Sequence, residues 1–118
     1  MTAPRVLVVE DDGLQALALE DMLEEMGCQV AASFGNVAKA LAWLEAGGQV
    51  DAALLDVNID GEHTYAVADL LLARRAPFCF TSGYGQVSER RFATTPMLGK
   101  PLNRQNLLAT LRGFGLAL

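Results

Sequence analysis

Short apolar runs alternate along the chain with longer segments whose apolar residues recur at helical spacing. The apolar runs predict five strands, at about 5–10, 29–33, 50–56, 78–81 and 97–99. The segments that follow them predict five helices, at about 14–26, 37–45, 65–75, 87–92 and 102–111. This alternation is typical of βα units packed on a parallel sheet. The pattern therefore predicts an α/β fold with one doubly wound, five-stranded parallel sheet.

Capping residues mark several of these boundaries. Asp12 and Asn36 stand where the first two helices begin, and each can accept a hydrogen bond from a backbone N–H group of the first turn. Gly27 follows the first helix and predicts its C-cap. Residues 58–62 are polar and predict a loop. The segment around 87–92 is dominated by Ser, Arg and Thr, so it predicts only a short helix.

The length and composition fit one domain that spans residues 1–118. Apolar residues make up 52% of the chain, which is enough for a core without disulfide or metal cross-links. No linker or repeat interrupts the pattern, so we expect no output domain. The net charge of −5 argues against direct binding of nucleic acid. Because no apolar run approaches the roughly 20 residues of a membrane helix, and the first residues lack a signal-peptide pattern, the sequence predicts a cytoplasmic protein without a membrane span.

Some residue types that often carry chemistry have simple interpretations here. Cys28 and Cys79 lie in apolar, strand-like surroundings, and we expect both to be reduced and buried. His63 has no cysteine or second histidine near it in the sequence, which predicts an ordinary surface residue. The pair Arg90-Arg91 is the nearest approach to a basic patch, and we interpret it as a solvated helix face.

Side chains capable of chemistry stand at the ends of four predicted strands. Glu10 and Asp11 follow the first strand, and Asp56 ends the third. Ser82 follows the fourth strand, and Lys100 follows the fifth. The carboxyl ends of parallel strands meet at one edge of an open sheet, where such folds place their sites. We therefore expect these side chains to lie together.

The acidic members of this set predict phosphoryl transfer to a carboxylate. Asp56 can act as a nucleophile toward a phosphoryl donor and form an acyl phosphate. Three negative charges at one sheet edge are costly unless a divalent cation neutralises them. Glu10, Asp11 and Asp56 therefore predict a Mg²⁺ site, to which Asn58 could add its backbone carbonyl.

The other two members suit the same reaction. Lys100 would supply a positive charge to one phosphoryl oxygen, and the hydroxyl of Ser82 could donate a hydrogen bond to another. Taken singly, the acids could be helix caps, and Lys100 and Ser82 could be turn residues. Their meeting at one sheet edge favours catalysis by positioning and charge neutralisation.

With these motifs, the chain resembles the response-regulator receiver family of two-component signalling over essentially its whole length. The matching segments are Val8 to Asp12, Leu54 to Asn58, Ser82-Gly83 and Gly99-Lys100-Pro101. The resemblance implies a flavodoxin-like receiver fold with strand order 2-1-3-4-5 and five helices.

The resemblance also assigns roles by position. Asp56 matches the phosphoacceptor, and Glu10 and Asp11 match the acidic pair that holds Mg²⁺. Lys100 matches the lysine that contacts the phosphoryl group, and its bond to Pro101 is expected to be cis. Ser82 matches the switch hydroxyl because it lies five residues after Pro77 and before the small Gly83, although Thr81 remains an alternative.

One position departs from the usual receiver pattern. Met97 stands three residues before the lysine, where receivers usually carry an aromatic switch residue. The segments Phe80 to Gly85 and Asp56 to Asn58 instead resemble the FAT GUY group of stand-alone receivers, with Thr81 in place of a small residue. We hypothesise that Tyr84 takes over part of the switching or shields the acyl phosphate from water.

The resemblance implies a response regulator that receives a phosphoryl group on Asp56 in a Mg²⁺-dependent reaction. The donor would be a sensor histidine kinase or a histidine phosphotransfer protein, and segments Leu14 to Met22 and Leu102 to Asn106 would set kinase specificity. The output would be binding of a downstream protein that the sequence does not identify, or a phosphorelay role in which the phosphoryl group is passed onward or drained, by a monomer or weak dimer. The chain would not be an enzyme beyond catalysing its own phosphoryl uptake and loss.

Two other functions fit parts of the pattern. A phosphatase of the haloacid-dehalogenase type also forms an aspartyl phosphate, but it needs a second acid where Asn58 stands, and this chain is short for its substrate pocket. A pseudo-receiver would keep the fold and bind partners without phosphorylation. The complete set of acids with Lys100 argues against the pseudo-receiver, whereas Met97 is compatible with it.

Overall fold

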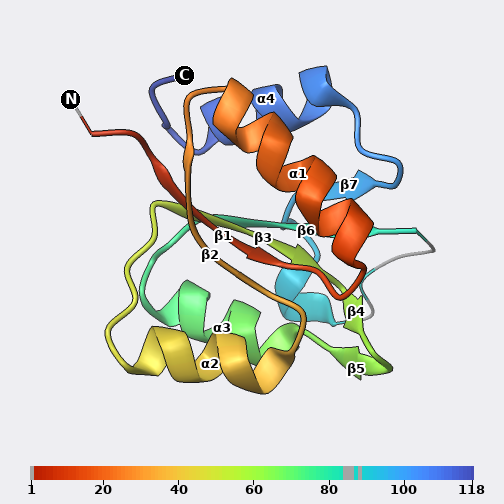
Figure 1. Ribbon diagram of the computed structural model, residues 1–118. Coiled ribbons are helices and arrows are strands. Elements are labelled where there is room, and N and C mark those ends of the chain that lie inside the picture. The colour runs from red at the N-terminus through yellow and green to blue at the C-terminus, as the bar shows by residue number, and fades with distance from the viewer. Residues whose placement is uncertain (1, 84–86, 88) are drawn as a thin grey trace.

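The computed structural model describes residues 2–83, 87 and 89–118, and its centre is a parallel β-sheet (Figure 1). The strands of this sheet are β1 (Arg5–Val9), β2 (Gln29–Phe34), β3 (Ala52–Asp56), β6 (Phe78–Ser82) and β7 (Met97–Gly99). They pair in the order β2-β1-β3-β6-β7, and every pair is parallel. In chain order this is 2-1-3-4-5, so the predicted topology is confirmed.

Within the part of the chain that the structure describes, four α-helices cover the two faces of the sheet. They are α1 (Gly13–Glu25), α2 (Val37–Glu45), α3 (Tyr65–Ala73) and α4 (Arg104–Gly113). The helices α1 and α4 lie on one face and α2 and α3 on the other, which gives three layers (Figure 1). None of the helices in the described ranges has the length and hydropathy needed to cross a membrane.

The predicted caps form at the helix ends. Asp12 Oδ1 accepts hydrogen bonds from the backbone N–H groups of Leu14 and Gln15, at 3.0 and 3.1 Å. Asn36 Oδ1 accepts one from the N–H of Lys39 at 3.0 Å. Gly27 follows α1 with a φ of +93°, a conformation that glycine adopts without steric cost. Local sequence therefore sets these boundaries.

Alternate residues of the central strands enter two separate cores. On β1, Val6 and Val8 pack with residues of α1 and α4, whereas Leu7 and Val9 pack with residues of α2 and α3. All of β3 is buried because helices cover both of its faces. The core beside α3 is rich in aromatic rings, with edge-to-face contacts among Phe78, Phe80 and Phe92. This packing fixes the strand ends from which the site is built.

The predicted loop at 58–62 is wrong, because this segment forms a small hairpin. Strand β4 (Asn58–Ile59) pairs antiparallel with β5 (Glu62–His63). Between them Asp60 and Gly61 have φ values of 51° and 80°. Two consecutive positive φ values are the mark of a type I′ turn, for which Asp-Gly is a preferred pair. That dipeptide was the sequence signal for a hairpin.

The predicted short helix at 87–92 is confirmed only in part. Over the described residues of this segment, the structure has only the 3₁₀ turn η1 (Arg90–Phe92). Phe92 is buried in the aromatic core, and Arg91 forms ion pairs with Asp69 and Glu89. Val87 also packs against this core, but residues five positions apart do not lie on one side of an α-helix, so the segment lacks the apolar stripe of an amphipathic helix. Arg91 is exposed, as predicted, and its ion pairs with Asp69 and Glu89 lie on the surface.

Both cysteines are free and buried, as predicted. Burial raises the pKa of the Cys28 thiol and raises the pKa of the Cys79 thiol to about 12. A raised pKa lowers the fraction of reactive thiolate at pH 8. We therefore expect Ellman's reagent to modify Cys79 in the folded protein at least about a thousandfold more slowly than in the denatured protein, where the pKa returns toward 8.5. Release of two thiols per chain in denaturant is the control, and rapid release before denaturation would contradict the prediction.

Candidate functional site

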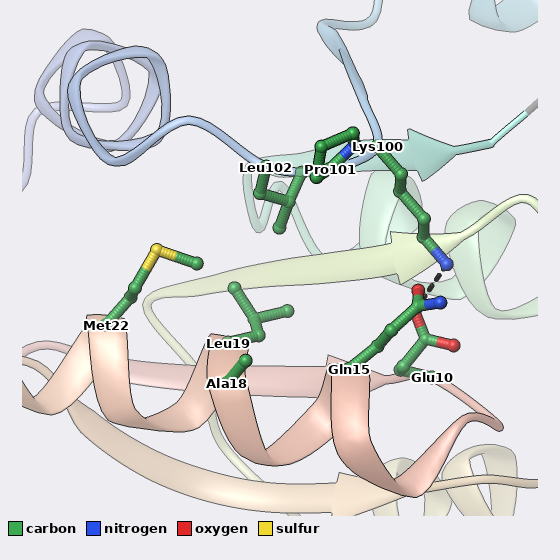
Figure 2. A pocket seen from close by; sticks show the side chains of 8 residues that line it. All are labelled: Glu10, Gln15, Ala18, Leu19, Met22, Lys100, Pro101 and Leu102. Atoms are coloured by element: carbon green, nitrogen blue, oxygen red, sulfur yellow. Dashed lines mark hydrogen bonds and ion pairs between the residues drawn. The ribbon is translucent and has the colours of Figure 1, made fainter.

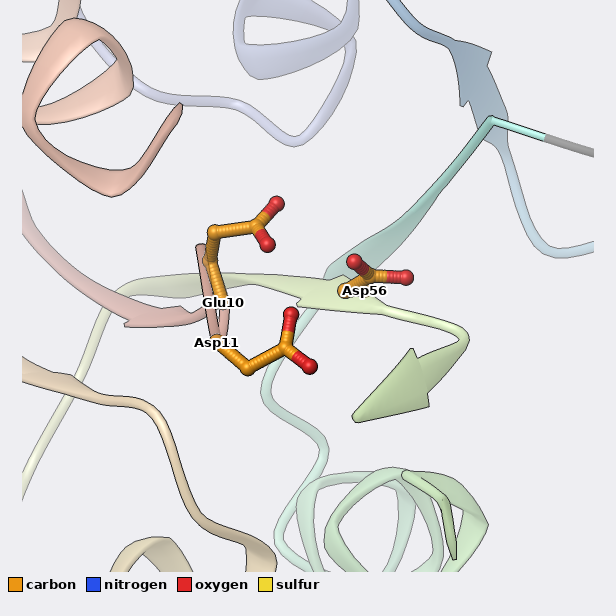
Figure 3. A group of neighbouring side chains, drawn as sticks. All are labelled: Glu10, Asp11 and Asp56. Carbon is orange, nitrogen blue, oxygen red and sulfur yellow. The ribbon is translucent and has the colours of Figure 1, made fainter. Parts of the chain in front are cut away.

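Three carboxylates meet at the carboxyl edge of the sheet (Figure 3). Glu10 and Asp11 follow β1, and Asp56 is the last residue of β3. Each offers an oxygen atom, and these three atoms all lie within 4.8 Å of one another. Glu10 and Asp56 are buried, at 6% and 8% exposure, whereas Asp11 is exposed. The predicted acidic cluster is therefore present, with its open side at Asp11.

Lys100 joins two of these carboxylates. Its Nζ atom lies 2.5 Å from Glu10 Oε1 and 2.6 Å from Asp56 Oδ2, and Figure 2 shows the lysine reaching down toward Glu10. The lysine follows β7, and its peptide bond to Pro101 is cis. Burial alone would lower the pKa of Lys100, but its hydrogen bonds to Asp56 and Glu10 outweigh burial and raise that pKa. The side chain is therefore a cation at neutral pH.

The other oxygen of each buried acid also accepts a hydrogen bond. Asp56 Oδ1 accepts from the backbone N–H of Asn58 at 3.1 Å, and Glu10 Oε2 accepts from that of Asp12 at 3.1 Å. Burial raises the pKa of Glu10, and the hydrogen bond from Lys100 opposes this rise. These contacts fix both carboxylates in orientation before any ligand binds.

A cavity of about 670 Å³ opens above Asp56. Its lining includes Asp11, Asn58, Ser82 and Lys100, so these sequence-predicted residues share one space with Asp56. Glu10 lines the neighbouring cavity on the other side of Lys100. Thr81 is buried and does not line this cavity, which favours Ser82 for the predicted hydroxyl. Carboxylate and carbonyl oxygens are the donors that suit Mg²⁺, and the oxygens of this cluster are close enough to share one ion. The residues present therefore fit a magnesium site, with Glu10, Asp11, Asp56 and the Asn58 carbonyl as the candidate ligands.

A second cavity, of about 450 Å³, lies on the other side of Lys100, between α1 and the segment after β7. Figure 2 shows Ala18, Leu19 and Met22 of α1 facing Leu102 across it. The neighbouring positions Leu14 and Leu17 are exposed, at 81% and 56%. The two segments that the sequence assigned to kinase specificity therefore border one apolar hollow beside the site.

The sequence profile of the response regulator receiver domain matches residues 6–112, which is most of the chain. The chain belongs to this family. No curated protein matches the receiver significantly in sequence.

Solved structures of other receivers are similar to this one. The solution structure of SdrG from Sphingomonas melonis Fr1 is 38% identical, with a TM-score of 0.85, over 98% of this receiver and 100% of SdrG. The BeF₃-activated conformation of SdrG from Pseudomonas melonis Fr1 is 41% identical, with a TM-score of 0.76, over 94% and 98% of the two chains. The receiver domain of PhyR from Erythrobacter litoralis, at 24% identity, has a TM-score of 0.84 over 97% and 91% of the chains and supports the fold.

Two residues of this receiver to which the sequence analysis assigned no functional role, His63 and Thr64, lie at the site. The His63 ring lines the cavity above Asp56 and stacks on the Tyr65 ring, with centroids 4.7 Å apart and planes 8° from parallel. It is exposed, as predicted, but it is not isolated. Thr64 is fully buried, and its hydroxyl donates a hydrogen bond to the Asp56 carbonyl at 2.7 Å. A threonine just before a helix predicts only a cap, so no local signal indicated this contact.

Of Met97 and Tyr84, the two residues that the sequence analysis connected with switching, the structure describes only Met97. Met97 is partly buried and packs against the aromatic core that contains Phe80 and Phe92. An aromatic side chain is thus absent from the position three residues before Lys100, and the usual aromatic relay has no ring there. Tyr84, the predicted substitute, lies outside the residues that the structure describes.

Proposed function

We propose that this receiver takes a phosphoryl group onto Asp56 from a phosphohistidine of a sensor kinase or phosphotransfer protein, and that it signals by binding another protein. The contact that carries the proposal is the ammonium group of Lys100, 2.6 Å from Asp56 Oδ2, beside a cluster of three acids. A purely structural ion pair would not need a second and third carboxylate at the same place. The arrangement suits a nucleophile that must receive an anionic group.

The reaction forms one bond and breaks another. A carboxylate oxygen of Asp56 attacks phosphorus, the P–N bond of the donor breaks, and its electron pair returns to the imidazole nitrogen. In this proposal Lys100 neutralises charge on the transferred group and Ser82 donates a hydrogen bond to it, which is supported by the Lys100–Asp56 contact and by the cavity that both residues line. Bound Mg²⁺ would supply further charge neutralisation. The receiver would catalyse only this uptake and the later hydrolysis, by positioning and charge.

The hollow beside α1 supports a protein as the donor. It is lined by Lys100 and by Ala18, Leu19 and Met22 of α1, so an apolar surface lies next to the reacting group. The same helix also carries the exposed Leu14 and Leu17. Exposed apolar residues grouped beside a site are typical of protein-binding surfaces. We propose that the phosphohistidine protein docks there.

The test is incubation with a small phosphodonor and Mg²⁺, followed by intact-mass measurement. We expect one phosphoryl group per chain, lost when the metal is chelated before donor is added. The same experiment is repeated with a histidine kinase as donor, because a protein donor adds docking contacts. Absence of uptake from both donors would favour the pseudo-receiver, which would bind its partner equally well with and without donor.

Replacement of Asp11 tests the metal site. Asp11→Asn keeps the shape of the side chain but removes one of the three charges, so we expect the Mg²⁺ dissociation constant to rise at least about tenfold. The matched control is Asp12→Asn, which changes the adjacent carboxylate, outside the cluster, and keeps an N-cap of equal quality. Calorimetric titration with Mg²⁺ measures both. Equal loss of affinity in the two variants would mean that net charge, rather than the cluster, attracts the ion.

A further inference from the structure

Thr64 uses its hydroxyl in a way that is unusual for its position. It is the N-cap residue of α3, where a threonine oxygen normally accepts a hydrogen bond from the first turn of the helix. Here the side chain makes no capping bond and instead donates its hydroxyl proton to the Asp56 carbonyl, at 2.7 Å. The residue is 0% exposed, so water does not compete for this bond. Helix α3 therefore lacks a side-chain cap at Thr64, and the hydroxyl instead fixes the end of β3, which carries Asp56.

The same residue closes the chain segment between β3 and α3. The backbone N–H of Thr64 donates to the carbonyl of Val57 at 3.1 Å, next to the bond from its hydroxyl. Inside the segment, the N–H of Asn58 donates to Asp56 Oδ1. Asp56 is thus held through its carbonyl by Thr64 and through its carboxylate by Asn58. A shift of the backbone at Asp56 would move both groups.

The tip of the hairpin is fastened to the acidic cluster as well. The N–H of Asp60 donates to Asp11 Oδ2 at 2.8 Å. With two residues in each strand, the hairpin β4–β5 is too short to be stable alone. Its position therefore depends on its anchors, which are the tip contact at Asp11, the buried Ile59 and the bonds of Thr64 at its base.

We propose that Thr64 is a positioning residue for phosphoryl transfer. Its hydroxyl holds the backbone of Asp56 and the base of the hairpin, and so places the nucleophilic carboxylate relative to the Asn58 carbonyl. The role rests on the function proposed above. Removal of the hydroxyl leaves a buried carbonyl without this donor, which favours a local shift of the chain. Small displacements of reacting or ligating groups cost far more in binding and rate than in folding.

Two substitutions separate positioning from packing. Thr64→Val keeps the shape and removes the hydroxyl, whereas Thr64→Ser keeps the hydroxyl and removes a methyl group. We expect the Mg²⁺ dissociation constant to rise about 10-fold to 100-fold in Thr64→Val and to stay within about threefold of wild type in Thr64→Ser. The midpoints of thermal unfolding should not rank the two variants in this way, because Thr64→Ser loses the contacts of a buried methyl group and is destabilised as well. Thr110→Val is the control, since it removes a hydroxyl bond of the same kind, to Asn106 in α4, far along the chain from the site.

A second readout needs no metal. In metal-free protein, the amide hydrogens of Asn58 and Asp60 are held by the two site carboxylates. We expect them to exchange with solvent at least about tenfold faster in Thr64→Val than in Thr64→Ser, while the amide hydrogens of Val8 and Leu54 keep similar protection in both. If Thr64→Val does not fold, Mg²⁺ affinity and amide exchange are compared between Thr64→Ser and Thr64→Ala instead, because these two variants differ only in the hydroxyl.

The outcomes are distinct. Equal Mg²⁺ affinity and equal exchange in the variants with and without the hydroxyl, beside a wild type that binds Mg²⁺, would overturn the role of Thr64 alone. A wild type that neither binds Mg²⁺ nor takes up a phosphoryl group would overturn the proposed function. Loss of both properties in Thr64→Ser to the same extent as in Thr64→Val would assign Thr64 to packing and overturn positioning.

Discussion

Asp56→Asn is expected to abolish phosphoryl uptake, leaving the intact mass unchanged after incubation with donor and Mg²⁺. An amide of the same shape offers no anionic oxygen to attack phosphorus. The fold should persist, because the amide oxygen can still accept the hydrogen bond from Asn58 and because one of three clustered charges is removed. Far-UV circular dichroism and thermal unfolding check the fold. If the fold is unchanged, the loss of phosphoryl uptake is caused by the loss of the reacting carboxylate.

The control for this prediction is Asp60→Asn. Asp60 lines the same cavity and is exposed, but its carboxylate is not part of the three-acid cluster. Its positive φ of 51° is one that asparagine tolerates, so the hairpin turn should survive. We expect uptake at the wild-type level. Phosphorylation that persists in Asp56→Asn and disappears in Asp60→Asn would show that the wrong acid was assigned.

Lys100→Gln is expected to slow phosphoryl uptake by about 10²-fold to 10³-fold, the usual effect of removing one charged or hydrogen-bonding group that stabilises developing charge. The ammonium group contacts Asp56 and lines the cavity that the proposed function assigns to the incoming phosphoryl group. Glutamine keeps much of the length of the side chain and loses the charge. Initial rates of uptake at saturating Mg²⁺ measure the effect.

The same substitution should also lower the free energy of unfolding. Lys100 bridges two acids whose side chains are only 4% and 10% exposed, and its loss leaves their charges facing each other. Lys39→Gln is the control for both readouts, because it removes an exposed charge from α2. A Lys100→Gln variant that loses stability but takes up the phosphoryl group at the wild-type rate would limit Lys100 to a structural counter-charge.

Sequence alone determined the frame of this receiver. The buried runs of β1 and β3 and the caps Asp12 and Asn36 follow from residue type and spacing, which act over a few neighbouring residues. Once the strands are parallel, their carboxyl ends must share an edge, so Glu10, Asp11 and Asp56 could be placed together without coordinates.

The sequence interpretation differed from the structure in two segments, at 58–63 and at 87–92. The Asp60-Gly61 pair indicated a hairpin that residue polarity alone described as a loop. Around Phe92 the pattern supported a short helix, yet Val87 and Phe92 do not lie on one side of an α-helix, and only the 3₁₀-helix Arg90–Phe92 forms. In both segments the structure that forms depends on the turn preference of a few residues and on how few apolar side chains reach the core.

Only the tertiary structure decided which polar groups meet at the site. The bond from Asp60 to Asp11 joins residues 49 positions apart, and the bonds from Lys100 to Glu10 and Asp56 span 90 and 44. Thr64 could equally have capped its helix, and its hydroxyl reaches Asp56 because the short hairpin returns the chain to the strand end. Pairings of this kind depend on distances set by the whole packed chain, whereas strands, helices and caps depend on near neighbours. The sequence therefore determined the arrangement of strands and helices and the acids at the edge of the sheet, and the packing determined how Asp56 is held.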